Sequence, residues 1–227
     1  MTRPKAAGWT LPALLLVLSL LPMAVAALRL VQLPMGSLPE DESARFAATP
    51  LALWLHSLGG VLFGLLGPVQ FSNVLRQRFG RAHRVAGRLF VLAGLALALP
   101  SFRLLWVFPE VSTPLLTLAR GLAAAGLALC LVLGVDAARR GRFAFHRAWM
   151  IRAYALGMGA ATVALFFVPL FALGIEVPPP LVSDLIFVAS WVFNLALAEW
   201  VIRRGQASQA ESPTEKARHS GRAFPNA

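Results

Sequence analysis

The chain has 227 residues, of which 58% are hydrophobic and 14% are charged, and its formal net charge is +11. Soluble domains are usually closer to half apolar and a quarter charged, so this composition indicates a polytopic membrane protein. The positive charge does not indicate nucleic-acid binding, because the arginines occur in short clusters between apolar runs. A single cysteine, Cys130, excludes a disulfide framework within the chain.

Apolar runs of about 20 residues, each long enough to cross a bilayer, predict an all-α transmembrane bundle of about six spans. Proline and charged residues separate the runs, and Pro68, Pro100 and Pro169 predict kinks inside them. The predicted spans are 10–31, 50–72, 87–107, 114–136, 149–173 and 182–202. Residues 1–204 form the predicted membrane domain, and the polar segment 205–227 is predicted to be a disordered cytoplasmic tail.

Most of the 21 lysine and arginine residues fall on one side of the predicted membrane. They occupy the N-terminus, the segments 73–88 and 137–152, and the tail, whereas the other loops carry glutamate and aspartate. The positive-inside rule then places both termini in the cytoplasm. Arg3 and Lys5, followed by an apolar stretch and small residues, also match a signal peptide, but the stretch is long for one. We therefore expect the first span to remain uncleaved.

Two corners of the chain resemble each other, GRAHRVAGRLF around His83 and GRFAFHRAWMIRAY around His146. When the two histidines are aligned, an apolar span, an arginine-rich turn and a second span match on both sides. The sequence therefore predicts a helical hairpin made of spans two and three and a second, similar hairpin made of spans four and five. The same alignment leaves His56 without a histidine counterpart and puts Arg120 near that position.

His83 and His146 begin spans three and five on the same side, each heading a stripe of small residues that should face the bundle interior. Two neutral imidazoles on facing helices can ligate one b-type haem, with Arg84 and Arg147 near its propionates. These four residues are therefore candidates for cofactor binding, and haem b is the candidate cofactor. The alternative is that the histidines bond to loop carbonyls while the arginines bind lipid phosphate.

His56 lies roughly 9 Å from the outer end of its span and about 20 Å from the arginine-rich corners, at 1.5 Å per residue. It is therefore too distant to share a metal with the other two histidines. Arg103 and Arg120 belong to the same outer third, and ionisable residues within spans are functional candidates. His56 and Arg120 form a candidate ligand-binding pair for an anion, a quinone head group or haem propionates. Alternatively, Arg120 pairs with His56 or with backbone carbonyls, and Arg103 extends outward to the interface.

Polar residues of span six are expected to have structural roles. Glu199 and Arg203 are four residues apart and predict an ion pair, and Asn194 predicts a hydrogen bond to another helix. No Walker loop, GxSxG motif or HExxH motif occurs in the sequence. Nothing therefore indicates a hydrolase or an ATPase.

Four motifs occur in a fixed order, HSLGGVLFGLLGPVQF, HRVAGRLF, HRAWMIRAYAL and WVFNLALAEWVIRR. With them the chain resembles an uncharacterised family of bacterial membrane proteins, domain of unknown function 2306, over residues 50–204. The resemblance implies a multi-span inner-membrane protein that is embedded in lipid and has no established activity. Relatives are expected to carry an arginine where Ala164 stands. The chain is also distantly similar to membrane cytochromes of the b561 kind, which bind two haems, but His56 lacks the second histidine that such a pair needs.

Three functions are compatible with these features. The first is a redox protein that binds one haem or a quinone, which requires spans three and five to face each other. The second is a small-molecule or ion transporter or sensor, which requires His56 and Arg120 to lie together inside the bundle. The third is a structural assembly partner, in which the glycine stripes only pack helices.

Overall fold

The computed structural model describes residues 7–38, 49–106, 113–176 and 178–220. Its helices are α1 (Ala7–Met35), α3 (Pro50–Gln70), α4 (Asn73–Arg78), α5 (Gly80–Leu105), α6 (Pro114–Arg139), α7 (Phe143–Gly157), α8 (Gly159–Ala172) and α9 (Pro180–Ser220). Within the described ranges, 6 helical segments are long and apolar enough to cross a membrane, and α7 with α8 forms one of them. The predicted all-α, multi-span architecture is thus confirmed.

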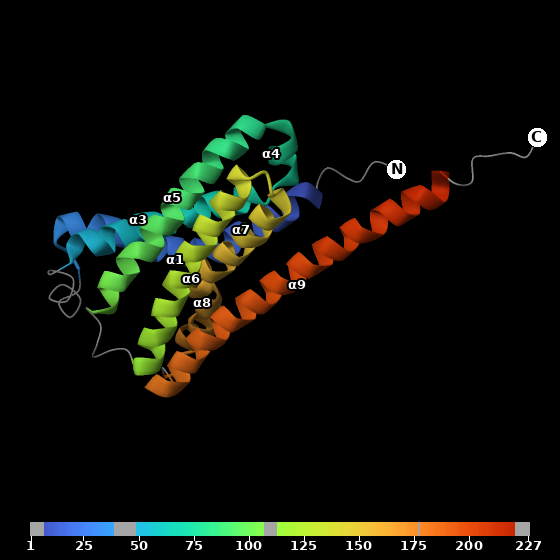
Figure 1. Ribbon diagram of the computed structural model, residues 1–227. Coiled ribbons are helices and arrows are strands. Elements are labelled where there is room, and N and C mark those ends of the chain that lie inside the picture. The colour runs from blue at the N-terminus through green and yellow to red at the C-terminus, as the bar shows by residue number, and fades with distance from the viewer. Residues whose placement is uncertain (1–6, 39–48, 107–112, 177, 221–227) are drawn as a thin grey trace, which may run out of the picture.

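The helices form a ring in which each packs against the next and α8 contacts α1. α1 packs along α3, α3 along α5, α5 along α6, and α6 along α7, while α9 contacts α7 and α8 and α8 returns to α1. In Figure 1 the starts of α1, α5 and α7 and the ends of α3, α6 and α9 lie toward the same side of the molecule. The arginine clusters 76–88 and 139–152 belong to that side, which we call the arginine-rich end.

The two most extensive helix pairs are the hairpins α3–α5 and α6–α7. α3 and α6 both begin with a proline, Pro50 and Pro114, which is favoured in the first helical turn because its missing N–H would be unpaired there anyway. Each hairpin turns at the arginine-rich end and carries a histidine, His83 or His146, in the first turn of its second helix. This correspondence agrees with the predicted repeat.

The fifth span differs from its prediction. A single helix over 149–173 with a kink at Pro169 was expected, but the helix breaks at Met158 and α8 continues through Pro169. Gly157 and Gly159 flank the break. Glycine has more backbone freedom than any other residue and is a poor helix former, so the flanking pair explains why the helix bends there.

α9 continues to Ser220, into the segment for which a disordered tail is predicted. Of the 16 residues 205–220, 9 are alanine, glutamine, glutamate, lysine or arginine. These residues are good helix formers, so the last span can continue as a helix beyond its apolar part. Residues 221–227 of the predicted tail lie outside the described residues.

Glu199 bonds to Arg152 of α7, while its predicted partner Arg203 remains within electrostatic range. Arg152 donates from Nε to Oε1 over 2.5 Å and from Nη2 to Oε2 over 3.0 Å. Two parallel bonds from a planar guanidinium are stronger and more specific than a single contact between neighbouring helical turns. The ion pair therefore joins the last span to the second hairpin.

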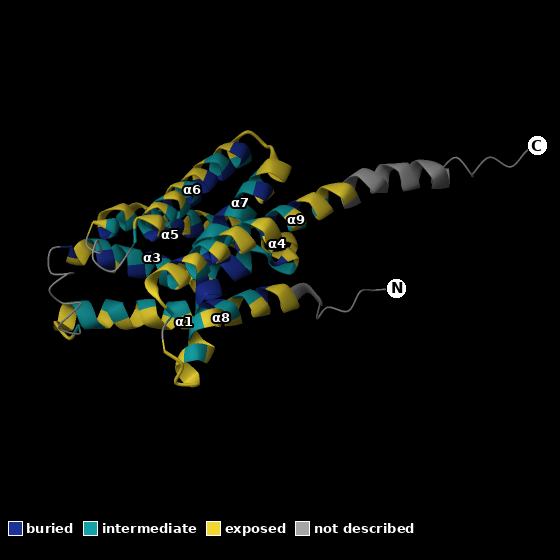
Figure 2. Cartoon of the chain, turned by 90° about the horizontal axis from the view of Figure 1, so that it is seen from below, coloured by how far each residue is buried: buried dark blue, intermediate teal, exposed yellow. Residues whose placement is uncertain are grey.

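Aromatic rings from α3, α5 and α7 form the centre of the bundle. Phe63 stacks on Phe90 with ring centroids 4.5 Å apart and on Tyr154 at 5.7 Å, and Phe71 meets the same tyrosine edge-on at 5.1 Å. Figure 2 shows buried residues on the sides that face between helices and exposed residues along the outside. Many of the exposed residues are leucine, valine and phenylalanine. An apolar outer surface is what lipid contact requires.

Gly59 brings the backbone of α3 against the backbone of α5. A Cβ added at this position would lie 2.5 Å from the amide nitrogen of Leu97 and 2.7 Å from the carbonyl oxygen of Ala93. Neither backbone atom can rotate away as a side chain could. At the next residue, Gly60, the nearest atom to an added Cβ is a side-chain carbon of Leu97 at 3.7 Å, an ordinary contact.

We therefore expect Gly59→Ala to lower the free energy of unfolding by about 1–3 kcal/mol, because it forces two helices apart. Gly60→Ala should leave it unchanged or raise it by up to about 1 kcal/mol, since alanine is the better helix former. Thermal unfolding of the detergent-purified variants, followed by circular dichroism, measures both effects. Equal melting temperatures for the two variants would contradict the backbone contact.

Candidate functional site

His146 is oriented by the hairpin that carries it. Gly141, with a φ of 70°, allows the tight turn that leads from α6 into α7. His146 Nδ1 lies 2.9 Å from the carbonyl oxygen of Gly134 on α6. Because a carbonyl oxygen can only accept a hydrogen bond, Nδ1 of the neutral ring carries the proton and Nε2 keeps a free lone pair. Metal-binding histidines commonly have this arrangement, in which a carbonyl fixes both the tautomer and the ring.

His83 lies in the first turn of α5, and its Nδ1 is buried without a hydrogen-bond partner in the described part of the chain. The ring is within electrostatic range of Arg76, Arg84 and His146. Arg76 reaches it because Ser72 caps the short helix α4, which packs on α5. The structure thus brings the two predicted histidines into one region at the arginine-rich end.

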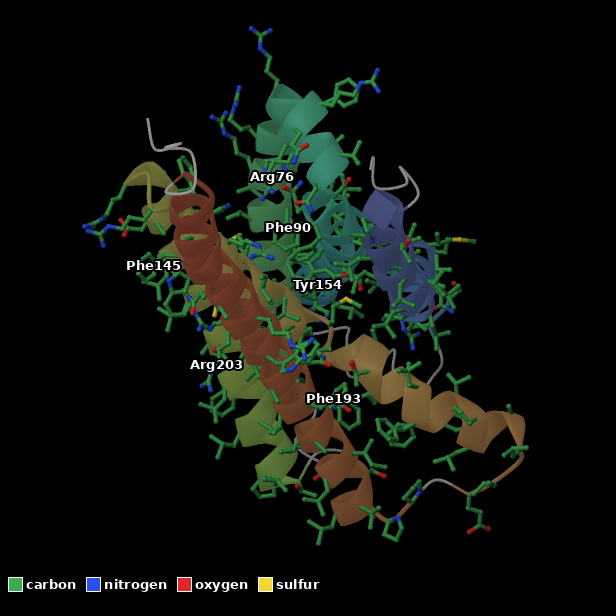
Figure 3. All side chains as sticks on the ribbon, turned by 90° about the vertical axis from the view of Figure 1, so that its right-hand side faces the viewer. Arg76, Phe90, Phe145, Tyr154, Phe193 and Arg203 are labelled. Carbon is green, nitrogen blue, oxygen red and sulfur yellow. The ribbon has the colours of Figure 1, made fainter. Side chains whose placement is uncertain are left out.

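α5 and α7 meet through side chains rather than through close backbone contact. The rings of Phe90 and Tyr154 have centroids 6.4 Å apart. They follow the two histidines by two helical turns, so they lie roughly 10–12 Å deeper at 1.5 Å per residue. Figure 3 shows Arg76, Phe90 and Tyr154 in succession from the arginine-rich end into the bundle. The histidines therefore lie above an aromatic floor made by these two rings and Phe71.

Two more buried polar atoms near this floor lack partners among the described residues, Gln70 Nε2 and Tyr154 Oη. Gln70 packs on α5, with Oε1 3.3 Å from where a Cβ at Gly87 would lie, one turn beyond His83. The tyrosine ring covers Gly67 of α3 and exposes only 5% of its surface. Buried polar groups nearly always have a partner. Three buried polar atoms without a partner, one each on α3, α5 and α7, therefore mark this region as a place where a ligand or ordered water can bind.

The two arginines predicted to flank the histidines, Arg84 and Arg147, lie in different surroundings. Arg84 stays close to His83. Arg147 lies against α9, with Nη1 2.8 Å from where a Cβ at Gly205 would lie, so its position does not support a role beside the histidines. Arg76, which sequence reasoning did not select, is the charged group that affects His83 most. Ser72 could have indicated this role of Arg76 from the sequence, because a capping serine predicts that the residues after it form a helix.

His56 lies at a different interface, between α3 and α5. Its Nδ1 is 2.8 Å from the carbonyl oxygen of Leu97 and 3.1 Å from the hydroxyl of Ser101. The hydroxyl donates to the same carbonyl over 2.8 Å. The other edge of the ring lines a cavity of about 110 Å³ between α1, α3, α5 and the break that separates α7 from α8.

Arg120 lies between α6 and α9, not beside His56. Its guanidinium carbon is 5.4 Å from the ring centroid of Phe187, and it is within electrostatic range of Asp184. The carboxylate of Asp184 accepts a hydrogen bond from Thr113, the residue that caps α6. The predicted pairing of His56 with Arg120 therefore finds no support in their positions. Arg103 is exposed.

In the described ranges no group of three or more histidine, cysteine, aspartate or glutamate side chains could hold a metal ion.

The family model described as "Predicted membrane protein (DUF2306)" matches residues 53–202, which include most of α3 and extend into α9. No curated protein and no solved structure matches the chain significantly.

We expect Tyr154→Phe to raise the free energy of unfolding of the ligand-free protein by about 1 kcal/mol, because it removes a buried hydroxyl without a partner. Thr162→Val is the contrasting variant. Thr162 donates to Asn194 Oδ1 over 2.9 Å, and the amide of Asn194 donates to the carbonyl of Ala155 over 3.1 Å, which confirms its predicted interhelical bond.

Thr162→Val should lower the free energy of unfolding by about 1–3 kcal/mol, because it leaves a buried amide oxygen unpaired. Chemical unfolding of both variants in detergent measures the two effects. If Tyr154→Phe destabilises as much as Thr162→Val does, the hydroxyl has a partner after all.

Proposed function

The chain belongs to the DUF2306 family of predicted membrane proteins, and we propose that it is a redox protein. In this proposal His83 and His146 together bind one b-type haem. One observation carries the proposal. Two histidines on separate helices share one region, and the ring nitrogen that His146 keeps free is the one a metal would bind. Bound haem would supply one-electron transfer.

The side chains around the histidines suit this cofactor. The unpartnered Nδ1 of His83 is a donor or acceptor that a ligand would satisfy. Arg76 and Arg84 bring positive charge to the same end, as carboxylate groups of a propionate would need. The hydrogen bond to the carbonyl of Gly134 holds the ring of His146 in place and increases its basicity.

The surroundings also favour a flat apolar group. α5 and α7 meet through side chains rather than through backbone contact, so a flat group could enter between them by moving side chains alone. The aromatic floor closes the inner side and excludes water from it. The transporter or sensor alternative required His56 and Arg120 to form one site, and they lie at different interfaces.

An optical spectrum tests the proposal. Protein purified in detergent from cells supplied with haem precursor should show a Soret band and, after reduction with dithionite, a sharp α band. His83→Ala and His146→Ala should each abolish both bands, because each removes one of the two histidines that would hold the iron.

His56→Ala is the matched control and should keep the spectrum, since its ring bonds to Leu97 at another interface. A colourless, monodisperse protein from haem-replete cells would overturn the proposal. So would bands that persist in both histidine variants.

We further propose that the arginine-rich end faces the cytoplasm of a bacterial cell whose inner membrane holds the protein. Fusions of green fluorescent protein after Gly141 and after Arg204 should then fluoresce, and a fusion of alkaline phosphatase after Gly174 should be active. The physical reason is that arginine clusters resist translocation. The reverse pattern of reporter activities would refute this orientation.

A further inference from the structure

The cavity beside His56 is a second potential binding site, and none of the residues proposed above to hold a haem lines it. We propose that this cavity binds the ring of a lipophilic quinol, one hydroxyl of which donates a hydrogen bond to His56 Nε2.

The orientation of the histidine determines what it can bind. Nδ1 lies 2.8 Å from the carbonyl oxygen of Leu97, which only accepts, so Nδ1 of the neutral ring carries the proton. Nε2 is then a hydrogen-bond acceptor, and no described residue bonds to it. A ligand at this position must bring a donor such as a hydroxyl group.

The rest of the lining selects a neutral, apolar ligand. Ser19 is the other lining residue with a polar side-chain atom, and its hydroxyl donates to the carbonyl of Leu16 over 2.8 Å. No charged side chain lines the cavity, so neither an anion nor a metal cation would find a counter-charge. Water is disfavoured as well, because a buried water needs two to four polar partners.

Size and shape indicate a single ring. The cavity has a volume of about 110 Å³. An engineered apolar cavity of about 150 Å³ holds benzene, so in this smaller cavity a substituted ring must extend through the open side. Phe63, whose ring stacks on Phe90, contributes apolar contact, and Gly60 and Gly64 form a wall without side chains. α1 contributes Met23 and Ala26 to the lining, and the cavity is partly open, so an isoprenoid tail could extend into the surrounding lipid.

Three ligands with the same ring and methyl groups test this proposal. Duroquinol carries hydroxyl donors, duroquinone carries only acceptors, and 1,2,4,5-tetramethylbenzene carries neither. Isothermal titration of the detergent-purified protein under anaerobic conditions measures the three affinities. Duroquinol should bind roughly tenfold more tightly than the other two, because one additional buried hydrogen bond increases affinity by about that factor.

Two variants separate the acceptor from the cavity. His56→Phe keeps an apolar ring and removes the acceptor, so the preference for duroquinol should disappear. Gly60→Leu fills the cavity while His56 remains in the sequence, so all three ligands should lose affinity. His219→Phe is the matched histidine control and should change none of the affinities.

Equal affinities of the unaltered protein for duroquinol and tetramethylbenzene would overturn the proposal. So would duroquinol binding that survives both His56→Phe and Gly60→Leu. The outcome is distinguishable from failure of the haem proposal, because a colourless protein that binds duroquinol supports this site and a haem-containing protein that does not bind it refutes this site.

Discussion

The first hairpin depends on the seam between α3 and α5, where Gly59 lets the two backbones touch. In lipid, helices gain little from the hydrophobic effect, so close packing of this kind contributes much of the association energy. The contact sets the register of the whole hairpin. It places His56 within hydrogen-bond distance of a carbonyl on α5 and stacks Phe63 on Phe90 two turns further along.

The seam between α5 and α7 is the opposite case. Here the backbones stay apart, and aromatic and polar side chains fill the space. At this seam His83, Gln70 and Tyr154 have buried polar atoms that find no partner among the described residues. A membrane protein has no water in the bilayer core to satisfy such atoms, so they are costly unless something binds them. The unpartnered polar atoms thus gather where the two hairpins meet, and the proposed haem site lies there.

The last span is attached by polar contacts. Arg152 on α7 holds Glu199 with two bonds, and Asn194 bonds to Thr162 and to the backbone of α7. These contacts lie on both sides of the break at Met158, so α9 joins α7 to α8 across it. A bent fifth span is therefore stabilised by its neighbour, and the bend brings the start of α8 beside the cavity that His56 lines.

Composition and periodicity alone determined that the chain is an all-α bundle of about six spans, that its hairpin is repeated, and that His83 and His146 begin corresponding helices. These properties follow from the length of each apolar run and from which residues share one helical face. Only the tertiary structure decided which neighbour each face meets. Arg147 lies against α9, and Arg120 lies beside Phe187 rather than beside His56. Glu199 bonds to Arg152 on another helix. Helical spacing sets the direction of a side chain on its own helix, but its partner depends on how separate helices pack, and that is a sum of many contacts between residues distant in sequence.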